Sequence, residues 1–231
     1  MLDFGSFDAL SFDCYGTLID WETGIIDAMT PLLNIHGIAA DSEEVLRIYS
    51  KLESAAQADP FVPYESVLRS IVKGFAERYE FNLQPGQENR LVQSLPAWPP
   101  FSDTVASLRK LKERYRLAIF SNISDALLSQ TLKILEVDFD CLITADRTRS
   151  YKPNPKHFLL GLEKLEIPKE KLLHVAESQR HDIEPAKELG IATVWVNRQT
   201  RKTTASGKGA GTASPDMEVK SLEELAGLMG V

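Results

Sequence analysis

The sequence has few of the residues that build disulfide frameworks and metal clusters. Among its 231 residues are two cysteines, Cys14 and Cys141, and four histidines. Two cysteines make neither a disulfide framework nor a zinc site, and the histidines lack the spacing of metal ligands. Cys14 is also a poor candidate nucleophile, because strand alternation turns it away from the face that carries Asp13. We therefore expect no disulfide scaffold and no cysteine or histidine metal cluster.

Long apolar runs and excess positive charge are also lacking. No run is long enough to span a bilayer, and the first residues lack the basic, apolar and small-residue pattern of a signal peptide. The net charge of −7 argues against a nucleic-acid-binding surface. We therefore expect a cytoplasmic protein with no membrane or nucleic-acid partner. An anionic substrate would need cations placed locally at its binding site.

What the sequence does contain is an alternation of short apolar runs and helical patterns, with 43% hydrophobic residues to form a core. Such alternation is typical of a parallel sheet covered by helices. The fold class predicted is α/β, a Rossmann-like doubly wound parallel sheet. Its strands are expected at 7–12, 116–120, 140–144, 172–176 and 191–196.

Residues 20–96 break this alternation, because they show four helical patterns and no convincing strand. We interpret them as an all-helical cap domain inserted after the first strand. The catalytic core would then comprise residues 1–19 and 97–231, with the proline-rich segment 96–101 as the return crossing. The segment 199–215, rich in Gly, Ser, Thr and Lys, is interpreted as a mobile loop.

Asp13 stands at the end of the first expected strand, directly before a turn through Gly16 and Thr17. Ligands of parallel sheets bind beyond the carboxyl ends of the strands, so this carboxylate is expected at the mouth of the fold. The alternative is that Asp13 only caps the turn that follows.

The segment 13–18, Asp-Cys-Tyr-Gly-Thr-Leu, closely resembles the first motif of the haloacid dehalogenase superfamily, in which the leading Asp is a nucleophile. The later motifs follow in the expected order, each after an expected strand. Ser121-Asn122 is similar to the second motif, the Lys152-Pro-Asn-Pro run to the third, and Asp182 to the fourth. Each match alone is weak, but four in order at strand ends are a strong resemblance that covers almost the whole core.

Tyr15 points to one branch of this superfamily, the L-2-haloacid dehalogenases of type II. Phosphatases of the superfamily have a second Asp at this position, which protonates the departing alkoxide. A halide leaves without a proton, and a Tyr hydroxyl with a pKa near 10 is a poor acid. The resemblance implies that Asp13 displaces the halide of a small anionic 2-haloacid and forms an ester. Water would then release a 2-hydroxy acid, with no cofactor.

The resemblance gives two further catalytic residues. Lys152 would hold Asp13 ionised and oriented, since an opposite charge nearby favours the ionised carboxylate. Its alternative is a surface lysine before a helix. Asp182 would orient or activate the hydrolytic water, and its alternative is a helix cap.

The resemblance also suggests substrate-binding side chains. Thr17 and Ser121 would bind the substrate carboxylate, and Asn122 would contact the halide; hydrogen bonding within their turns is the alternative for the first two. In these dehalogenases an arginine on the second cap helix helps to take the halide. Arg47 is the candidate here, unless it is simply solvated. The remaining expected substrate-binding residues are Tyr15, Phe61 and Ser178, and packing against the core is the alternative for Phe61.

Two other functions stay open. The fourth motif, 176–182, is one residue longer than the Ser-x-Asn-x-x-Asp pattern of well-known members. Glu177 lies where phosphatases carry a magnesium-binding Asp, so Asp13, Glu177 and Asp182 could hold Mg²⁺ in a phosphatase acting on a small metabolite. A binding module that only keeps the fold is the third interpretation. Dehalogenases of this kind are often dimers, so the resemblance makes a homodimer an expectation.

Overall fold

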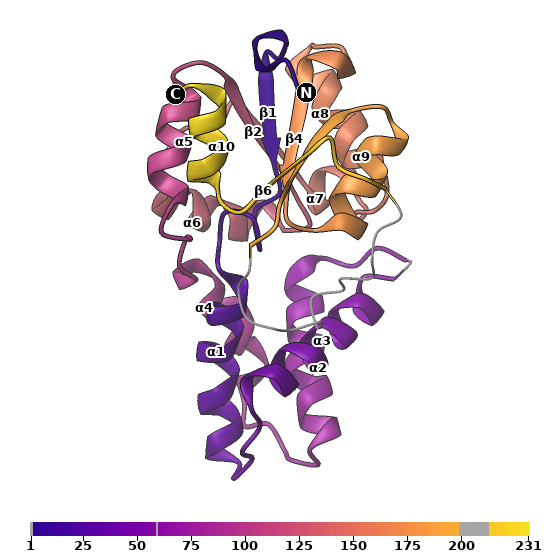
Figure 1. Cartoon of the computed structure of the whole chain (residues 1–231). Coiled ribbons are helices and arrows are strands. Elements are labelled where there is room, and N and C mark those ends of the chain that lie inside the picture. The colour runs from indigo at the N-terminus through magenta and orange to yellow at the C-terminus, as the bar shows by residue number, and fades with distance from the viewer. Residues whose placement is uncertain (1, 59, 199–212) are drawn as a thin grey trace.

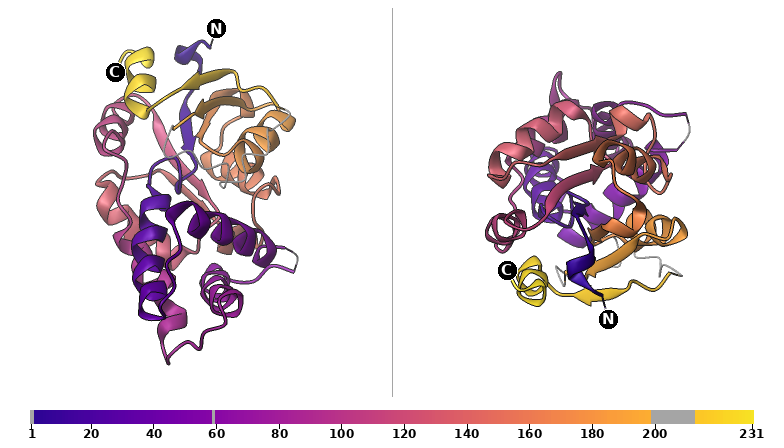
Figure 2. Two further views of the ribbon diagram at one scale, coloured as in Figure 1. Left: turned by 60° about the horizontal axis from the view of Figure 1, so that its bottom comes forward. Right: turned by 90° about the horizontal axis from the view of Figure 1, so that it is seen from above.

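The computed structural model describes residues 2–58, 60–198 and 213–231. It has two parts, a sheet with helices on both faces and a group of helices beside one end of the sheet (Figure 1). Both chain ends lie on the sheet part, away from the separate helices (Figures 1 and 2). Most of the loop expected at 199–215 lies outside the described residues. In the described part of the chain, no helix has the length and apolar character needed to cross a membrane.

The sheet has six strands in the order β3-β2-β1-β4-β5-β6, and every neighbouring pair is parallel. This confirms the predicted α/β, Rossmann-like doubly wound fold. Five strands agree closely with the expected ones, whereas β6 was not predicted from the sequence. The strands are β1 (Ala9–Phe12), β2 (Arg116–Ser121), β3 (Cys141–Thr144), β4 (Leu172–Ala176), β5 (Ala192–Val196) and β6 (Met217–Val219).

Strand β1 shows why the sheet is covered on both faces. All four of its residues are buried, as expected for a central parallel strand. Leu10 and Phe12 pack in one apolar cluster, with α5 (Thr104–Lys112) and α10 (Leu222–Met229). Ala9 belongs to a second cluster, with α8 (Lys156–Leu165) and α9 (Glu184–Glu188). The helices α6 (Asp125–Leu135) and α7 (Ala145–Thr148) complete the core.

The strand order places a binding crevice beside β1. The chain runs from β1 to β2 and β3 on one side, and then returns to β4 on the other side. Such a reversal opens a crevice at the carboxyl ends of the strands. Phe12 of β1 is in register with Ile119 of β2 and Val175 of β4, so the three strands end at the same edge.

The helical group contains α1 (Trp21–Ile35), α2 (Ser42–Ala56), α3 (Tyr64–Arg78) and α4 (Arg90–Ser94), and lies beside the carboxyl ends of the strands (Figure 1). Side chains of Asp20 and Asp41 begin α1 and α2 by accepting hydrogen bonds from the backbone of Thr23 and Glu44. We keep the proposed division into a core of 1–19 and 97–231 and a cap of 20–96.

The structure differs from the sequence prediction at the helix after β4. This helix was expected near 182–189, with Asp182 as its possible cap. Instead a π-helical turn spans Gln179–Ile183 and leads into α9. Ser178 is the residue that caps this turn, through a hydrogen bond from the backbone N–H of His181, so the cap interpretation of Asp182 is wrong.

Candidate active site

Lys152 joins two carboxylates at the crevice. Its Nζ lies 2.8 Å from Oδ1 of Asp13 and 2.6 Å from Oδ1 of Asp182, and it also donates to the carbonyl oxygen of Phe120 at 2.7 Å. The Lys152 side chain is only 2% exposed. The surface-lysine interpretation is therefore wrong. Three segments far apart in the sequence meet here: the end of β1, the loop before α8 and the π-helical turn after β4.

This cluster shifts the pKa values of its members in different directions. Burial raises the pKa of Asp13, with Lys152 opposing and the charge of Asp182 adding to the rise. Burial also disfavours ionisation of Asp182, but Lys152 and His174 outweigh it and lower the pKa of Asp182 to about 2. The two carboxylates likewise outweigh burial at Lys152 and raise its pKa. The arrangement therefore holds a charged lysine between two carboxyl groups.

His174 is a buried hydrogen-bond partner of Asp182 that was not predicted from the sequence. Its Nε2 is hydrogen-bonded to Oδ1 of Asp182 at 3.0 Å, and its Nδ1 to the hydroxyl of Ser11 at 2.8 Å. Ser11 and His174 are register partners on β1 and β4. Two polar residues inside otherwise apolar strands were the signal available in the sequence, but the pairing of the strands was needed to connect them.

Two expected substrate contacts hydrogen-bond to the protein itself. The Thr17 hydroxyl donates to Oδ2 of Asp13 at 3.3 Å and accepts from the backbone N–H of Glu177 at 2.9 Å. The Asn122 amide accepts from the Lys152 backbone N–H at 2.6 Å and donates to the Lys152 carbonyl at 3.1 Å. Thr17 thus fixes the carboxylate of Asp13, and Asn122 fixes the backbone of Lys152.

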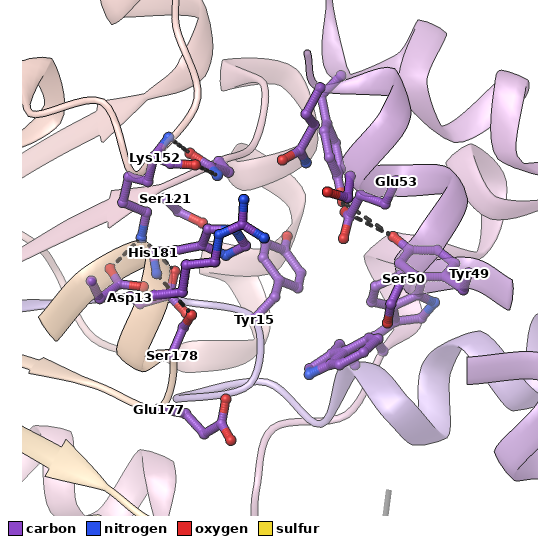
Figure 3. Close-up of a pocket in the computed structure, with 18 residues that line it drawn as sticks. Asp13, Tyr15, Tyr49, Ser50, Glu53, Ser121, Lys152, Glu177, Ser178 and His181 are labelled. Carbon is purple, nitrogen blue, oxygen red and sulfur yellow. Dashed lines mark hydrogen bonds and ion pairs between the residues drawn. The ribbon is translucent and has the colours of Figure 1, made fainter. Parts of the chain in front are cut away.

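A cavity of about 150 Å³ opens over this cluster, between the sheet edge and the cap (Figure 3). Seven of the expected site residues line it: Asp13, Tyr15, Ser121, Asn122, Lys152, Ser178 and Asp182. The cap supplies most of the opposite wall. Further lining residues include Trp21, Tyr49, Ser50, Glu53, Tyr64, Trp98, Glu177, Arg180 and His181.

Arg47 is not among the residues that line this cavity. Its side chain is 57% exposed and lies 3.9 Å from Glu44. The residues of α2 that line the cavity are Tyr49, Ser50, Glu53 and Ser54. Arg47 lies one helical turn before the lining residue Ser50, but its side chain pairs with Glu44 and stays outside the cavity lining. The structure therefore does not support Arg47 as the halide contact; it has the character of a solvated arginine.

Phe61 and Thr17 also lie outside the cavity lining. The Phe61 ring packs against Tyr151, with 5.3 Å between ring centroids, and lies under the guanidinium of Arg149. This is a packing role between cap and core. Thr17 is completely buried beside Asp13.

The cation on the cavity wall that the sequence did not single out is Arg180. It belongs to the π-helical turn, as does His181, and both line the cavity. A π-helical turn takes up more residues than an α-helical one and often occurs at functional sites. The extra residue in the fourth motif, 176–182, was therefore the feature of the sequence that indicated an unusual turn here. Burial lowers the pKa of His181, so its ring is neutral near pH 7.

Tyr15 is held so that it cannot readily supply a proton. Its hydroxyl is hydrogen-bonded to the hydroxyl of Thr131 at 2.7 Å, and its ring meets the edge of Trp98. Burial raises the pKa of Tyr15 well above its usual value of 10. A leaving group at this site therefore has no acid at the position where phosphatases carry Asp.

The three carboxyl groups that could hold Mg²⁺ do not form a metal site. Asp13, Glu177 and Asp182 all line the cavity, but the described residues contain no group of three acidic, histidine or cysteine side chains arranged around one ion position. Oδ1 of Asp182 is instead occupied by Lys152 and His174. The side chains present do not fit a magnesium ion bound by these three carboxylates.

The family-model comparison matches residues 7–190 to the haloacid dehalogenase-like hydrolases. The match covers more than half of the chain and includes all four motifs. The chain therefore belongs to the haloacid dehalogenase-like hydrolase family, and it is a hydrolase.

Individual relatives agree with this assignment. The chain is 28% identical over 230 residues to haloacetate dehalogenase H-2 of Moraxella sp. strain B, covering 97% of this chain and 98% of the relative. It is also 28% identical to an (S)-2-haloacid dehalogenase of Pseudomonas sp. strain YL, covering 95% and 93%. Its fold is similar to that of an L-2-haloacid dehalogenase from Xanthobacter autotrophicus with chloropropionic acid covalently bound, with a TM-score of 0.80, 22% identity and coverage of 97% and 98%.

Proposed function

We propose that this hydrolase cleaves the carbon–halogen bond of small 2-haloacids, through an ester formed on Asp13 and without a metal cofactor. The observation that carries the proposal is Tyr15. This residue stands where a phosphatase needs its acid, and its hydroxyl is buried against Thr131. Halide is a leaving group that needs no proton at this position. The names of the similar dehalogenases support the same reaction.

In the first step Asp13 attacks the carbon that bears the halogen. The carbon–halogen bond breaks, the halide takes the electron pair, and an ester joins the substrate to Asp13. Lys152 and Thr17 each hold one oxygen of this carboxylate, at 2.8 and 3.3 Å. They keep the Asp13 carboxylate oriented toward the cavity, which reduces the entropic cost of the attack. Covalently bound chloropropionic acid in the Xanthobacter enzyme agrees with this step.

In the second step water attacks the carboxyl carbon of Asp13 and releases a 2-hydroxy acid. Asp182 is the candidate to orient this water. Its Oδ1 is occupied by Lys152 and His174, while its buried Oδ2 has no hydrogen-bond partner among the described residues. A buried carboxylate oxygen without a partner is a ready acceptor for a water proton. Because the pKa of Asp182 is about 2, this group is ionised at neutral pH.

Arg180 is the cation that the cavity offers beside Lys152. Lys152 is already shared by two carboxylates, so the anionic substrate needs a second cation. Arg180 lines the cavity and forms no ion pair with any described residue. We assign it to the substrate carboxylate, since guanidinium binds carboxylates through paired hydrogen bonds. Ser121, Asn122 and Ser178 line the same cavity and complete the proposed contacts.

The test is halide release from (S)-2-chloropropionate and chloroacetate, with and without EDTA, with Asp13→Asn as the control. The proposal expects release that survives EDTA and disappears in the variant. Hydrolysis of p-nitrophenyl phosphate that requires added Mg²⁺, with no halide release, would establish the phosphatase instead. A folded protein inactive in both assays would indicate a binding module.

A further inference from the structure

The cap wall of the cavity carries a carboxyl group that the proposed reaction does not use. Glu53 of α2 lines the cavity, and its Oε1 accepts hydrogen bonds from the hydroxyls of Tyr64 at 2.7 Å and Tyr49 at 3.2 Å. Figure 3 shows Glu53 and Tyr49 on one side of the cavity and Asp13 with Lys152 on the other. Glu53 forms no ion pair with any lysine or arginine that the structure describes.

The charges around the cavity are therefore unbalanced. Asp13 and Asp182 share Lys152, and the substrate carboxylate would take Arg180. In its ionised form Glu53 adds a negative charge that neither cation neutralises. A partly buried carboxylate without a cation carries a desolvation cost. In agreement, burial raises the pKa of Glu53, although its two tyrosine hydrogen bonds oppose the rise. A bound ligand with a positive charge would remove this imbalance.

The side chains around Glu53 also suit a cation. Trp21, Tyr49 and Tyr64 line the same wall, and the rings of Trp21 and Tyr49 lie 5.8 Å apart between centroids. Aromatic faces attract ammonium groups, most strongly where water is displaced. A hydroxyl group on the ligand would interact only with the Glu53 carboxylate, and an apolar tail would interact only with the aromatic rings. An ammonium group interacts with both.

We propose that Glu53, Tyr49, Tyr64 and Trp21 form an ammonium subsite, and that the preferred substrate is a small 2-haloacid with a protonated amine at its far end. The proposal rests on the proposed function for the reacting end of the molecule and specifies the substrate class. The cavity of about 150 Å³ is as large as one that holds benzene in another protein, so only a short chain fits between the two ends. The amine keeps its proton throughout the reaction.

The test compares two substrates of nearly equal size, 4-amino-2-chlorobutyrate and 2-chloropentanoate, which differ in an ammonium or a methyl group. Initial halide release is measured against an enzyme-free blank. We expect kcat/KM for the amine to be higher by about tenfold or more, the size of effect given by a hydrogen bond to a charged group. Glu53→Gln should abolish the preference, since it keeps the shape and removes the charge. Glu43→Gln, an exposed position on the same helix, should retain it.

Binding of the unreactive products tests the subsite independently of the reaction. Calorimetry with the wild-type protein compares 4-amino-2-hydroxybutyrate with 2-hydroxypentanoate. Binding of the amine that is tighter by about tenfold, and that loses this advantage in Glu53→Gln, supports the subsite. This holds even if the enzyme releases no halide. In that case only the proposed function fails. Equal binding, no binding of the amine, or a preference that persists in Glu53→Gln would overturn the ammonium subsite.

Discussion

The two walls of the cavity differ in origin and in what they do. The core wall is built from the ends of parallel strands, and there Lys152 holds Asp13 and Asp182 within 2.8 Å. The cap wall is formed by α2 with the starts of α1 and α3, and carries Trp21, Tyr49, Glu53 and Tyr64. The core wall follows the family pattern closely. The cap wall lacks the expected arginine and carries a carboxyl group instead.

The two walls therefore suit two different tasks, catalysis of the reaction and selection of the substrate. Strands in register bring their ends to one edge, so the fold itself places the proposed reacting groups. A helix face can change its side chains at helical spacing without disturbing the sheet. We infer that the core wall determines the reaction and that the cap wall determines which substrate is accepted. The predictions that follow test the two walls and the core beneath them.

Asp13→Asn should reduce kcat for halide release by at least about a thousandfold, because the amide cannot form the ester. Its thermal midpoint should stay close to that of the wild type, since the side chain lies at a strand end and keeps its shape. The measurements are steady-state halide release and thermal unfolding monitored by circular dichroism. A variant with the wild-type rate would remove Asp13 from the mechanism.

Lys152→Met should lower the free energy of unfolding by about 3–5 kcal/mol, the range for breaking a buried ion pair. It leaves Asp13 and Asp182 facing each other with no cation between them. Urea denaturation at pH 7 measures the loss. Lys156→Met, at an exposed position four residues later, is the matched control and should change little. Equal losses in the two variants would contradict the central role of Lys152.

Arg180→Ala should raise KM for 2-chloropropionate by about tenfold or more, through loss of a charge-assisted hydrogen bond to the substrate carboxylate. Arg47→Ala should stay within about twofold of the wild type, because its side chain lies outside the cavity. Steady-state kinetics of both variants sharpen the comparison of the walls. If Arg47→Ala raised KM more than Arg180→Ala does, the cap would be the part that supplies the cation.

His157 should make the core sensitive to mild acid. It is fully buried in α8, and burial lowers its pKa to about 3, against a smaller opposing contribution from the Ser121 backbone. The unfolded chain binds a proton near pH 6.5, whereas the folded chain does not. Stability should therefore fall as the pH drops below 6.5, by about 2 kcal/mol at pH 5 from this group.

Urea denaturation at pH 7 and pH 5 measures this loss, with His157→Leu as the comparison. The variant cannot titrate at this position, so its stability should decline less over the same interval. If both proteins lose the same stability, His157 does not cause the acid sensitivity.

Most of the core wall could be predicted from the sequence. Short apolar runs indicated five strands, and the motif residues after them were expected to converge because parallel strands end at one edge. The structure brings Asp13, Lys152 and Asp182 together as this reasoning requires. His174 was missed because a single histidine inside an apolar strand has no partner that can be identified until the strands are paired.

The cap wall could not be predicted in the same way. An amphipathic helix shows which face is apolar, but not which polar residues lie at the margin of that face. Arg47 is exposed and pairs with Glu44, although Ser50, one turn further along α2, lines the cavity. Arg180 and β6 were missed for related reasons: the π-helical turn shifts the helix phase, and a three-residue edge strand has too short a pattern to recognise.

A single turnover in heavy-oxygen water, with enzyme in excess over 2-chloropropionate, tests the covalent role of Asp13 most directly. Solvent attacks the carboxyl carbon of the enzyme ester, so mass spectrometry of the digested protein should find the label in the peptide that contains Asp13. The released 2-hydroxy acid should then carry an unlabelled hydroxyl. Label in the product alone would show that water attacks the substrate directly, and would contradict the account.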